Sequence, residues 1–319
     1  MGTVGKESRE GVPLTNLDDP LFDGADATKR DLIDYLDAIA DRMLPHLAGR
    51  PLSVIRVHRG QEAFMQKNLP KYAPGWIRTA PVWAEASHRE VTYALCDDRR
   101  TLLWFANQRA VEYHPTLSLA ERPEHPTHLV LDLDPPEGQE SFRRAAQVAQ
   151  LVRRALDEAG LTGAVKTSGA KGVHVVVPLA ESVGHEAASA ATRALAARTE
   201  QLDPELATTA FLKDDRGGKV FVDATRAGGA TVVAAYSPRV RPGVPVSFPV
   251  GWDDLDQVTP SDFTIRTVLG LADPWPAGWP DPQELPDELV AEGESIPTPR
   301  VQAMHEGKRR KAAARRKNA

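Results

Sequence analysis

The chain has 319 residues, of which 41% are hydrophobic and 26% are charged, a composition typical of a soluble globular protein with one large core or two lobes. The single cysteine, Cys96, excludes an internal disulfide and a cysteine-based zinc site, and no apolar stretch is long enough for a membrane span or a secretion signal. We therefore expect a cytoplasmic protein with no membrane partner.

The net charge of −5 is unevenly distributed along the chain. Residues 307–319 carry seven lysines and arginines and no acid, whereas residues 1–306 carry 32 basic and 44 acidic side chains, a net charge of −12. This balance does not favour a nucleic-acid partner for the main body, although it is compatible with a local basic channel. The basic tail has too little apolar content to fold and could contact phosphates.

The first predicted element is an amphipathic helix that begins after Thr28. Thr28 is a good N-cap with an acid three residues on, at Asp31, and apolar residues follow at helical spacing until Gly49. After it, residues 52–57 read as a strand, and residues 83–103 read as further short strands. We expect an antiparallel arrangement in this N-terminal lobe.

A second set of elements predicts a split β-α-β-β-α-β sheet. It consists of a strand at 128–134, a helix from about Ser141 to Ala159, strands at 164–167 and 173–177, a helix near 186–201 and a strand at 219–223. Residues 272–300 are rich in proline and predict an extended surface segment. We expect an α+β fold with a two-lobed domain at 1–300 and a disordered basic tail at 301–319.

Two acids at the end of the strand 128–134 carry the first chemical signal. Asp132 and Asp134 are two residues apart, so both carboxylates project from the same face of the strand. Such a pair requires compensation by a cation or a basic group, of which a metal ion is the simplest, and Asp223, at the end of another apolar strand, is a candidate third acid. Three carboxylates could hold two Mg²⁺ or Mn²⁺ ions for phosphoryl transfer. Alternatively, each acid is an ordinary solvated residue at a strand end.

A glycine-rich segment between these acids carries the second signal. Residues 168–174 read SGAKGVH, in which the glycines permit close approach of the backbone while Ser168, Lys171 and His174 present a hydroxyl, an ammonium and an imidazole. This suits a triphosphate, although the segment is no P-loop and could be a tight hairpin. His174 could equally be a core histidine and His114 a turn residue, and Arg226 and Arg239 could be surface charges.

Three longer segments occur in the order HLVLDLDPPEG, TSGAKGVHVVVPL and KVFVDATR, the last followed by TVVAAYSPRVRPGVPVSFPVGWDDL. Together with LTNLD, FMQKNLPKYAPGW and ANQRAVEYHP, they resemble the polymerase domain of bacterial ATP-dependent DNA ligase D, in the archaeo-eukaryotic primase superfamily. The resemblance extends from roughly Leu14 to Pro276.

This resemblance implies a primase-polymerase fold, with an RRM-like split β-α-β catalytic sheet joined to an N-terminal mixed α/β lobe. It also implies a polymerase that serves non-homologous end joining, prefers ribonucleotides, favours Mn²⁺ and extends 3′ ends at gaps, nicks and double-strand breaks. The implied partners are DNA, nucleoside triphosphates, a Ku-type end-binding protein and a separate ligase, at the bacterial nucleoid.

By motif position, the resemblance also implies roles for individual residues. The implied metal ligands are Asp132, Asp134 and Asp223. The implied nucleotide contacts are His114, Ser168, Lys171, His174, Arg226 and Arg239. The implied DNA contacts are Lys29, Phe64 and Lys67.

The chain departs from the family pattern at three positions that bear on DNA ends. Asp19 stands where a lysine is common, Met65 where a second phenylalanine follows Phe64, and Ala227 where an asparagine follows Arg226. The resemblance implies that a lysine at the first position, together with the one matching Lys29, would hold a 5′-phosphate. The sequence has no KxDG ligase motif, so we expect a stand-alone polymerase.

Two alternative functions explain part of these observations. A Mn²⁺-dependent glycosyltransferase also uses a DxD pair after an apolar strand, but it leaves the SGAKGVH segment without a role. A non-catalytic module that binds DNA ends would account for the altered positions Asp19 and Met65, but it leaves the intact acids unexplained.

Overall fold

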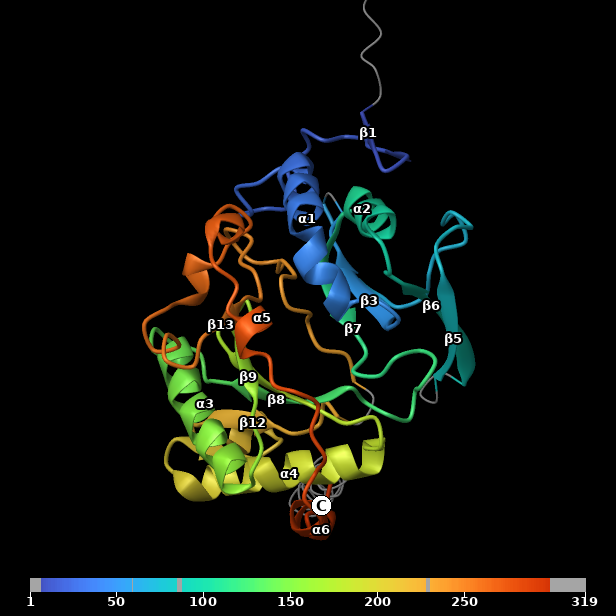
Figure 1. The fold of residues 1–319 in the computed structure, drawn as a ribbon. Helices are drawn as coiled ribbons and strands as arrows, with labels where there is room; N and C mark the ends of the chain where they lie inside the picture. The colour runs from blue at the N-terminus through green and yellow to red at the C-terminus, as the bar shows by residue number, and fades with distance from the viewer. Residues whose placement is uncertain (1–6, 59, 85–87, 228–229, 299–319) are drawn as a thin grey trace, which may run out of the picture. The chain divides into compact units, whose positions relative to one another are not determined.

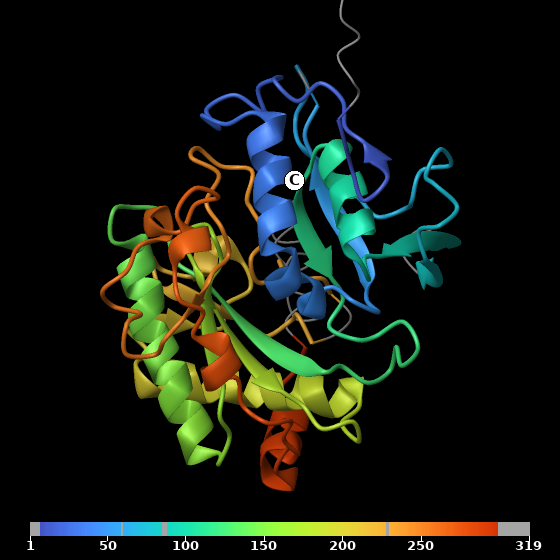
Figure 2. The ribbon, with the colours of Figure 1, turned by 45° about the horizontal axis from the view of Figure 1, so that its top comes forward.

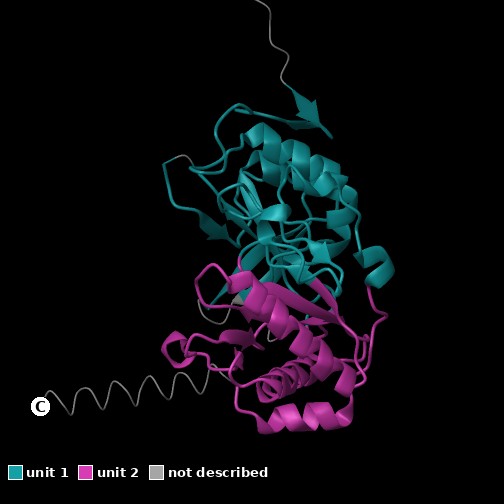
Figure 3. Cartoon of the chain, turned by 90° about the vertical axis from the view of Figure 1, so that its left-hand side faces the viewer, with its two compact units in different colours: residues 1–123, 166–170, 231–278 teal, residues 124–165, 171–230, 279–319 magenta. Residues whose placement is uncertain are grey.

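The structure, a computed structural model, describes residues 7–58, 60–84, 88–227 and 230–298. The chain forms two compact units, coloured separately in Figure 3. The first unit comprises residues 1–123, 166–170 and 231–278, and the second comprises residues 124–165, 171–230 and 279–319. The tail predicted at 301–319 lies outside the described residues.

The first unit contains an antiparallel sheet of five strands, with the order β4-β3-β6-β5 and with β7 paired to β3. Its strands are β3 (Pro51–Arg56), β4 (Phe64–Gln66), β5 (Thr79–Ala84), β6 (Arg89–Leu95) and β7 (Ala110–Pro115). The expected antiparallel N-terminal arrangement is therefore confirmed. The unit also contains the short strands β1 (Ser8–Arg9), β2 (Val12–Pro13) and β13 (Pro249–Val250) and the one-turn helix α5 (Trp275–Gly278).

Two helices, α1 (Lys29–Met43) and α2 (Arg99–Asn107), lie side by side in the first unit (Figure 2). Helix α1 begins as predicted, because the Thr28 hydroxyl accepts from the Asp31 amide while the Asp31 carboxylate accepts from the Thr28 amide at 2.7 Å. It ends at Met43, before the predicted end at Gly49, because Pro45 has no N–H to continue the helix.

The prediction that strands continue to residue 103 is wrong. The strands of this region end at Leu95, and the chain then enters α2, whose N-cap Asp98 accepts a hydrogen bond of 2.7 Å from the Thr101 amide. A carboxylate at the cap stabilises the free N–H groups of the first turn, and the following apolar residues pack at helical spacing.

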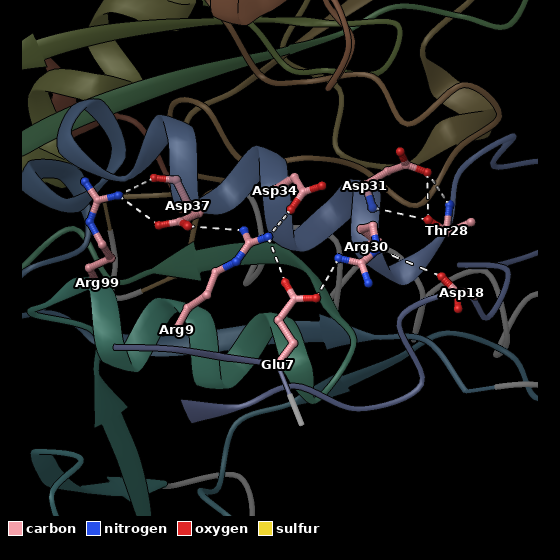
Figure 4. A network of polar contacts seen from close by, with 9 residues as sticks. All are labelled: Glu7, Arg9, Asp18, Thr28, Arg30, Asp31, Asp34, Asp37 and Arg99. Carbon is pink, nitrogen blue, oxygen red and sulfur yellow. Dashed lines mark hydrogen bonds and ion pairs between the residues drawn. The ribbon is translucent and has the colours of Figure 1, made fainter. Parts of the chain in front are cut away.

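An ionic network connects the N-terminal hairpin to α1 (Figure 4). The Arg9 guanidinium lies 3.1 Å from Glu7, 2.5 Å from Asp34 and 3.2 Å from Asp37. Asp37 also contacts Arg99 of α2 at 2.9 Å. The β1-β2 hairpin is thus held on the acidic face of α1 by ion pairs that have residues in common. Such a network contributes more to stability than isolated surface ion pairs do.

The second unit is built on the predicted β-α-β-β-α-β pattern, with the strand order β11-β12-β8-β10-β9. Its elements are β8 (His128–Asp134), α3 (Ser141–Glu158), β9 (Ala164–Thr167, whose last two residues belong to the first unit), β10 (Val173–Pro178), α4 (His185–Leu202), β11 (Ala207–Thr208) and β12 (Val220–Asp223). Helices α3 and α4 pack on the sheet and on each other (Figure 1). The predicted α+β fold with an RRM-like sheet is confirmed.

Strand β8 shows how this sheet separates a core face from a polar face. Leu129, Leu131 and Leu133 are fully buried, and they alternate with residues that include Asp132 and Asp134. Burial of the leucine face therefore fixes the direction in which both acids project.

Helix α6 (Asp287–Ser295) corrects the prediction of a purely extended segment at 272–300. Together with α5 it shows that this proline-rich stretch contains two short helices. Helix α6 packs closely on α4, because Gly293 has no side chain to hold the two backbones apart. None of the helices in the described part of the chain is long and apolar enough to cross a membrane.

We predict that Gly293→Ala destabilises the protein. A Cβ at this position would lie 1.8 Å from the Ala190 carbonyl oxygen, so α6 must shift away from α4, at a cost of about 2 kcal/mol or more. Urea unfolding should show a lower midpoint, whereas Glu294→Ala, at an exposed position of the same helix, should leave it nearly unchanged. Equal midpoints for all three proteins would contradict the close packing of these helices.

Candidate active site

The predicted acids of the second unit meet in one row across three strands. In the antiparallel register, Asp132 of β8 lies directly opposite Asp223 of β12 on one side and opposite His174 of β10 on the other. Residues paired in this way project from the same face of a sheet, and Asp134 follows two positions later on that face. The structure therefore brings together four side chains that the sequence predicted from separate segments.

Asp132 lies at the centre of this row. One of its carboxylate oxygens is 3.3 Å from His174 Nε2, and the other accepts a hydrogen bond of 2.9 Å from Arg226 Nη2. Burial by itself would raise the pKa of Asp132, but the charges and hydrogen bonds of His174 and Arg226 hold that pKa far below its ordinary value. Asp132 is therefore a carboxylate at neutral pH.

Arg226 bridges the two acids that face each other across β8 and β12. Its Nη2 atom is 2.9 Å from Asp132 and 3.1 Å from Asp223. Burial lowers the pKa of Arg226, but the two carboxylates outweigh this effect and raise it. Asp223 is also held by Thr225, whose amide and hydroxyl donate to it at 2.8 and 2.6 Å.

Asp134 is balanced by two further basic groups. Lys171 Nζ lies 3.4 Å from one oxygen, and Arg216 Nη1 lies 3.0 Å from the other. The Arg216 guanidinium also stacks 3.9 Å from the centre of the Phe221 ring, so it is held in a defined orientation. Arg216 was not expected from the sequence, because it lies in a loop with no motif to mark it.

The donor set at this row fits a divalent cation in its chemistry. Mg²⁺ and Mn²⁺ prefer carboxylate oxygens, and the row supplies three such groups. In the described residues, however, no group of three or more His, Cys, Asp or Glu side chains is arranged as a metal site. The acids are instead paired with Arg226, Arg216 and Lys171, which a bound cation would have to replace.

The other predicted nucleotide contacts lie in the first unit. His114 Nε2 is 2.9 Å from Glu112, and Arg239 Nε is 3.1 Å from the same carboxylate. Arg239 also donates to the carbonyl oxygen of Ser168. Burial raises the pKa of Glu112, but the hydrogen bond from His114 and the charge of Arg239 lower it to about 2. Glu112 was not expected from the sequence, although it lies two residues before His114 on the same face of β7.

Gly169 shows why the turn after Ser168 contains glycine. It has a φ of +67°, and a Cβ there would lie 2.7 Å from both the Ser247 amide nitrogen and the Arg239 side chain. Only glycine allows the chain to pass this closely to the segment that carries Arg239. The Ser168 hydroxyl accepts from the Ala170 amide at 3.2 Å, which closes the turn.

The predicted DNA contacts differ in exposure. Lys29 is buried, with 2% of its surface exposed, and its ammonium donates to the Thr15 carbonyl at 2.5 Å. Burial and the charge of Arg109 lower the pKa of Lys29 to about 8. By contrast, Phe64 and Lys67 are exposed on and beside β4, and the Phe64 ring stacks on His58 at 5.3 Å.

Known proteins resemble this chain over most of its length. The family described as LigD, primase-polymerase domain, matches residues 28–275. The multifunctional non-homologous end joining DNA repair protein LigD of Mycobacterium tuberculosis H37Rv is 38% identical over 279 residues, which are 83% of this chain and 36% of that protein. The bifunctional non-homologous end joining protein LigD of Bacillus subtilis is 36% identical over 264 residues, 81% of this chain and 42% of that protein.

The chain thus spans between a third and a half of the length of these two relatives. A solved structure, the polymerase domain from Mycobacterium tuberculosis ligase D in complex with DNA, matches with a TM-score of 0.74 and 37% identity. The match covers 81% of this chain and 93% of that one. By sequence and by fold, the chain therefore belongs to the family of LigD primase-polymerase domains, which are nucleotidyltransferases.

Proposed function

We propose that this chain adds nucleotides to DNA 3′ ends at gaps, nicks and double-strand breaks, and that it serves non-homologous end joining. The observation that carries the proposal is the row of Asp223, Asp132 and His174 across three strands, with Asp134 beside it. Membership of the LigD primase-polymerase family and the DNA-bound relative support the same substrate class. Ribonucleoside triphosphates are the proposed preferred substrate, with a Ku-type protein and a separate ligase as partners.

In this proposal, Asp132, Asp134 and Asp223 hold two divalent ions, Mn²⁺ or Mg²⁺. Bound ions would supply activation of the primer hydroxyl and charge for the pyrophosphate leaving group. The chain's own basic groups then have a second role. Arg226 and Lys171, which now neutralise the acids, would become available to the phosphates of an incoming nucleotide.

The proposed role of His174 is to hold Asp132 in a fixed orientation. It is 4% exposed and lies opposite Asp132 in the register of β8 and β10, so its contact with that carboxylate has little freedom. In the first unit, Arg239 and His114 would contact the nucleotide, as implied by their motifs. Phe64 and Lys67 supply an exposed aromatic ring and a charge of the kind that binds a DNA strand.

We predict that Asp132→Asn and Asp223→Asn each reduce Mn²⁺-dependent primer extension by at least about 100-fold, which corresponds to about 2.7 kcal/mol of transition-state stabilisation. DNA affinity should change little, because a duplex is held mainly by cationic contacts. Extension of a labelled primer and fluorescence anisotropy measure the two properties. Asp157→Asn, an exposed acid on α3, is the matched control, and near-normal extension by either site variant would refute the assignment.

A different prediction follows from the position of Arg226 between two acids. Arg226→Gln should raise the KM for nucleotide, because a phosphate contact is lost. The same change should tighten Mn²⁺ binding without nucleotide, because the cation no longer competes with a guanidinium for Asp132 and Asp223. Electron paramagnetic resonance of free Mn²⁺ gives the affinity, with Arg143→Gln on the exposed face of α3 as control. Weaker binding of Mn²⁺ would contradict this competition.

The acid at Asp19 predicts weak recognition of a 5′-phosphate. Asp19 is partly exposed and 3.8 Å from Arg109, so it neutralises a cation beside the entry to α1 and would repel a phosphate there by on the order of 1 kcal/mol. Asp19→Lys should increase the preference for 5′-phosphorylated over 5′-hydroxyl gaps about fivefold or more. Asp18→Lys, the same charge change at the neighbouring exposed position, is the control. A strong preference in the unmodified protein, unaffected by Asp19→Lys, would show that another residue binds the phosphate.

A further inference from the structure

The first unit contains a buried carboxylate to which the motifs assign no role. Glu112, in the middle of β7, has 4% of its surface exposed. Both of its oxygens are used: Oε2 contacts His114 Nε2 at 2.9 Å and Arg239 Nε at 3.1 Å, while Oε1 accepts from the Val240 amide at 2.8 Å. Glu112 therefore connects β7 to a segment almost 130 residues later in the chain.

The partners of Glu112 are the predicted nucleotide contacts of this unit. His114 lies two residues along the same strand, so both side chains project from one face. Arg239 is held at two points, by Glu112 at Nε and by the Ser168 carbonyl at Nη1. One carboxylate thus fixes the orientation of both the imidazole and the guanidinium.

Stability alone is a poor explanation for this arrangement. A buried ion is costly, and replacing a buried ion pair with well-packed apolar residues is often neutral or stabilising. A carboxylate with two hydrogen bonds and an ion pair does, however, select one geometry of its partners. It also remains charged, because the hydrogen bond from His114 and the charge of Arg239 oppose burial and hold its pKa at about 2.

The contact with Glu112 also determines the proton position on His114. A carboxylate only accepts hydrogen bonds, so the proton on the imidazole is placed on Nε2. In the neutral ring, Nδ1 is then an acceptor, which suits a hydroxyl donor such as that of a sugar. Arg239, oriented by the same carboxylate, suits an anionic phosphate.

We propose that Glu112 is the positioning residue of the nucleotide site: it orients His114 toward a sugar hydroxyl and Arg239 toward a phosphate of a nucleoside triphosphate. This inference rests on the proposed function, because it assigns the nucleotide to this cluster. Glu112 itself does not contact the nucleotide; it acts through its two partners.

The decisive variant is Glu112→Gln, which keeps the shape of the side chain. Its side chain carries no charge, so the ion pair with Arg239 is lost, and its amide nitrogen is a donor that cannot accept from His114 or the Val240 amide. We expect the KM for nucleotide and the dissociation constant of a fluorescent ATP analogue, measured without DNA, to rise about tenfold. The value of kcat should change by less than about threefold, and DNA affinity should stay the same. Glu121→Gln, an exposed glutamate of the same unit, is the matched control.

A double-mutant cycle separates positioning from general stability. If Glu112 acts through His114, Glu112→Gln should raise the KM much less in a His114→Ala background than in the unmodified protein. Equal effects in both backgrounds, or an unchanged KM in the single variant, would overturn the inference. Thermal melting of each variant identifies any loss of folding.

A measurement on the unmodified protein is independent of how the variants fold. Nitrogen-15 NMR of the histidine side chains should show His114 with its proton on Nε2, and a neutral ring protonated on Nδ1 would overturn the proposal. Failure of this inference can also be distinguished from failure of the proposed function. A protein that binds the ATP analogue through Glu112 but does not extend DNA would refute the polymerase and leave this nucleotide site intact.

Discussion

Repulsion between two facing carboxylates, Asp132 and Asp223, determines how charges are arranged on the polar face of the second unit's sheet. Register places Asp132 and Asp223 opposite each other on neighbouring strands, a separation at which like charges repel. The fold tolerates the pair because Arg226 contacts both carboxylates. Asp134 repeats the pattern with Lys171 and Arg216. On the polar face of the second unit, the three acids are therefore paired with basic side chains. A bound cation and a phosphate would have to replace these ion pairs.

In the first unit the ratio of acids to basic partners is reversed. One carboxylate, Glu112, accepts hydrogen bonds from His114 and the Val240 amide and forms an ion pair with Arg239. Such a group has little freedom, because moving it leaves several buried donors unpaired. The turn at Gly169 adds a second constraint, since the backbone passes too close to Arg239 for any side chain. The two units thus organise their polar groups differently, by mutual neutralisation in one and by convergence on a single acceptor in the other.

Local sequence patterns determined several features correctly, and each has a local physical cause. Alternation in residues 128–134 places Asp132 and Asp134 on one face, because successive side chains of a strand point to opposite sides. Thr28 and Asp31 cap α1 through contacts within four residues. The order of strands and helices predicted the split β-α-β-β-α-β sheet, since few topologies are compatible with this order of elements. Local patterns failed at residues 99–103, where the cap at Asp98 outweighed the strand-like appearance of the segment.

The tertiary structure alone decided which of these residues meet. The sequence by itself determined the acids, their expected meeting at one site, the glycine turn and the family resemblance. It did not indicate the strand register that places Asp223 directly opposite Asp132, or that Arg216 reaches Asp134. Nor did it mark Glu112, whose two side-chain partners are a neighbour on the same strand and a residue far along the chain. Register and long-range hydrogen bonds depend on how separate segments pack, whereas helix caps and strand faces depend on residues close in the sequence.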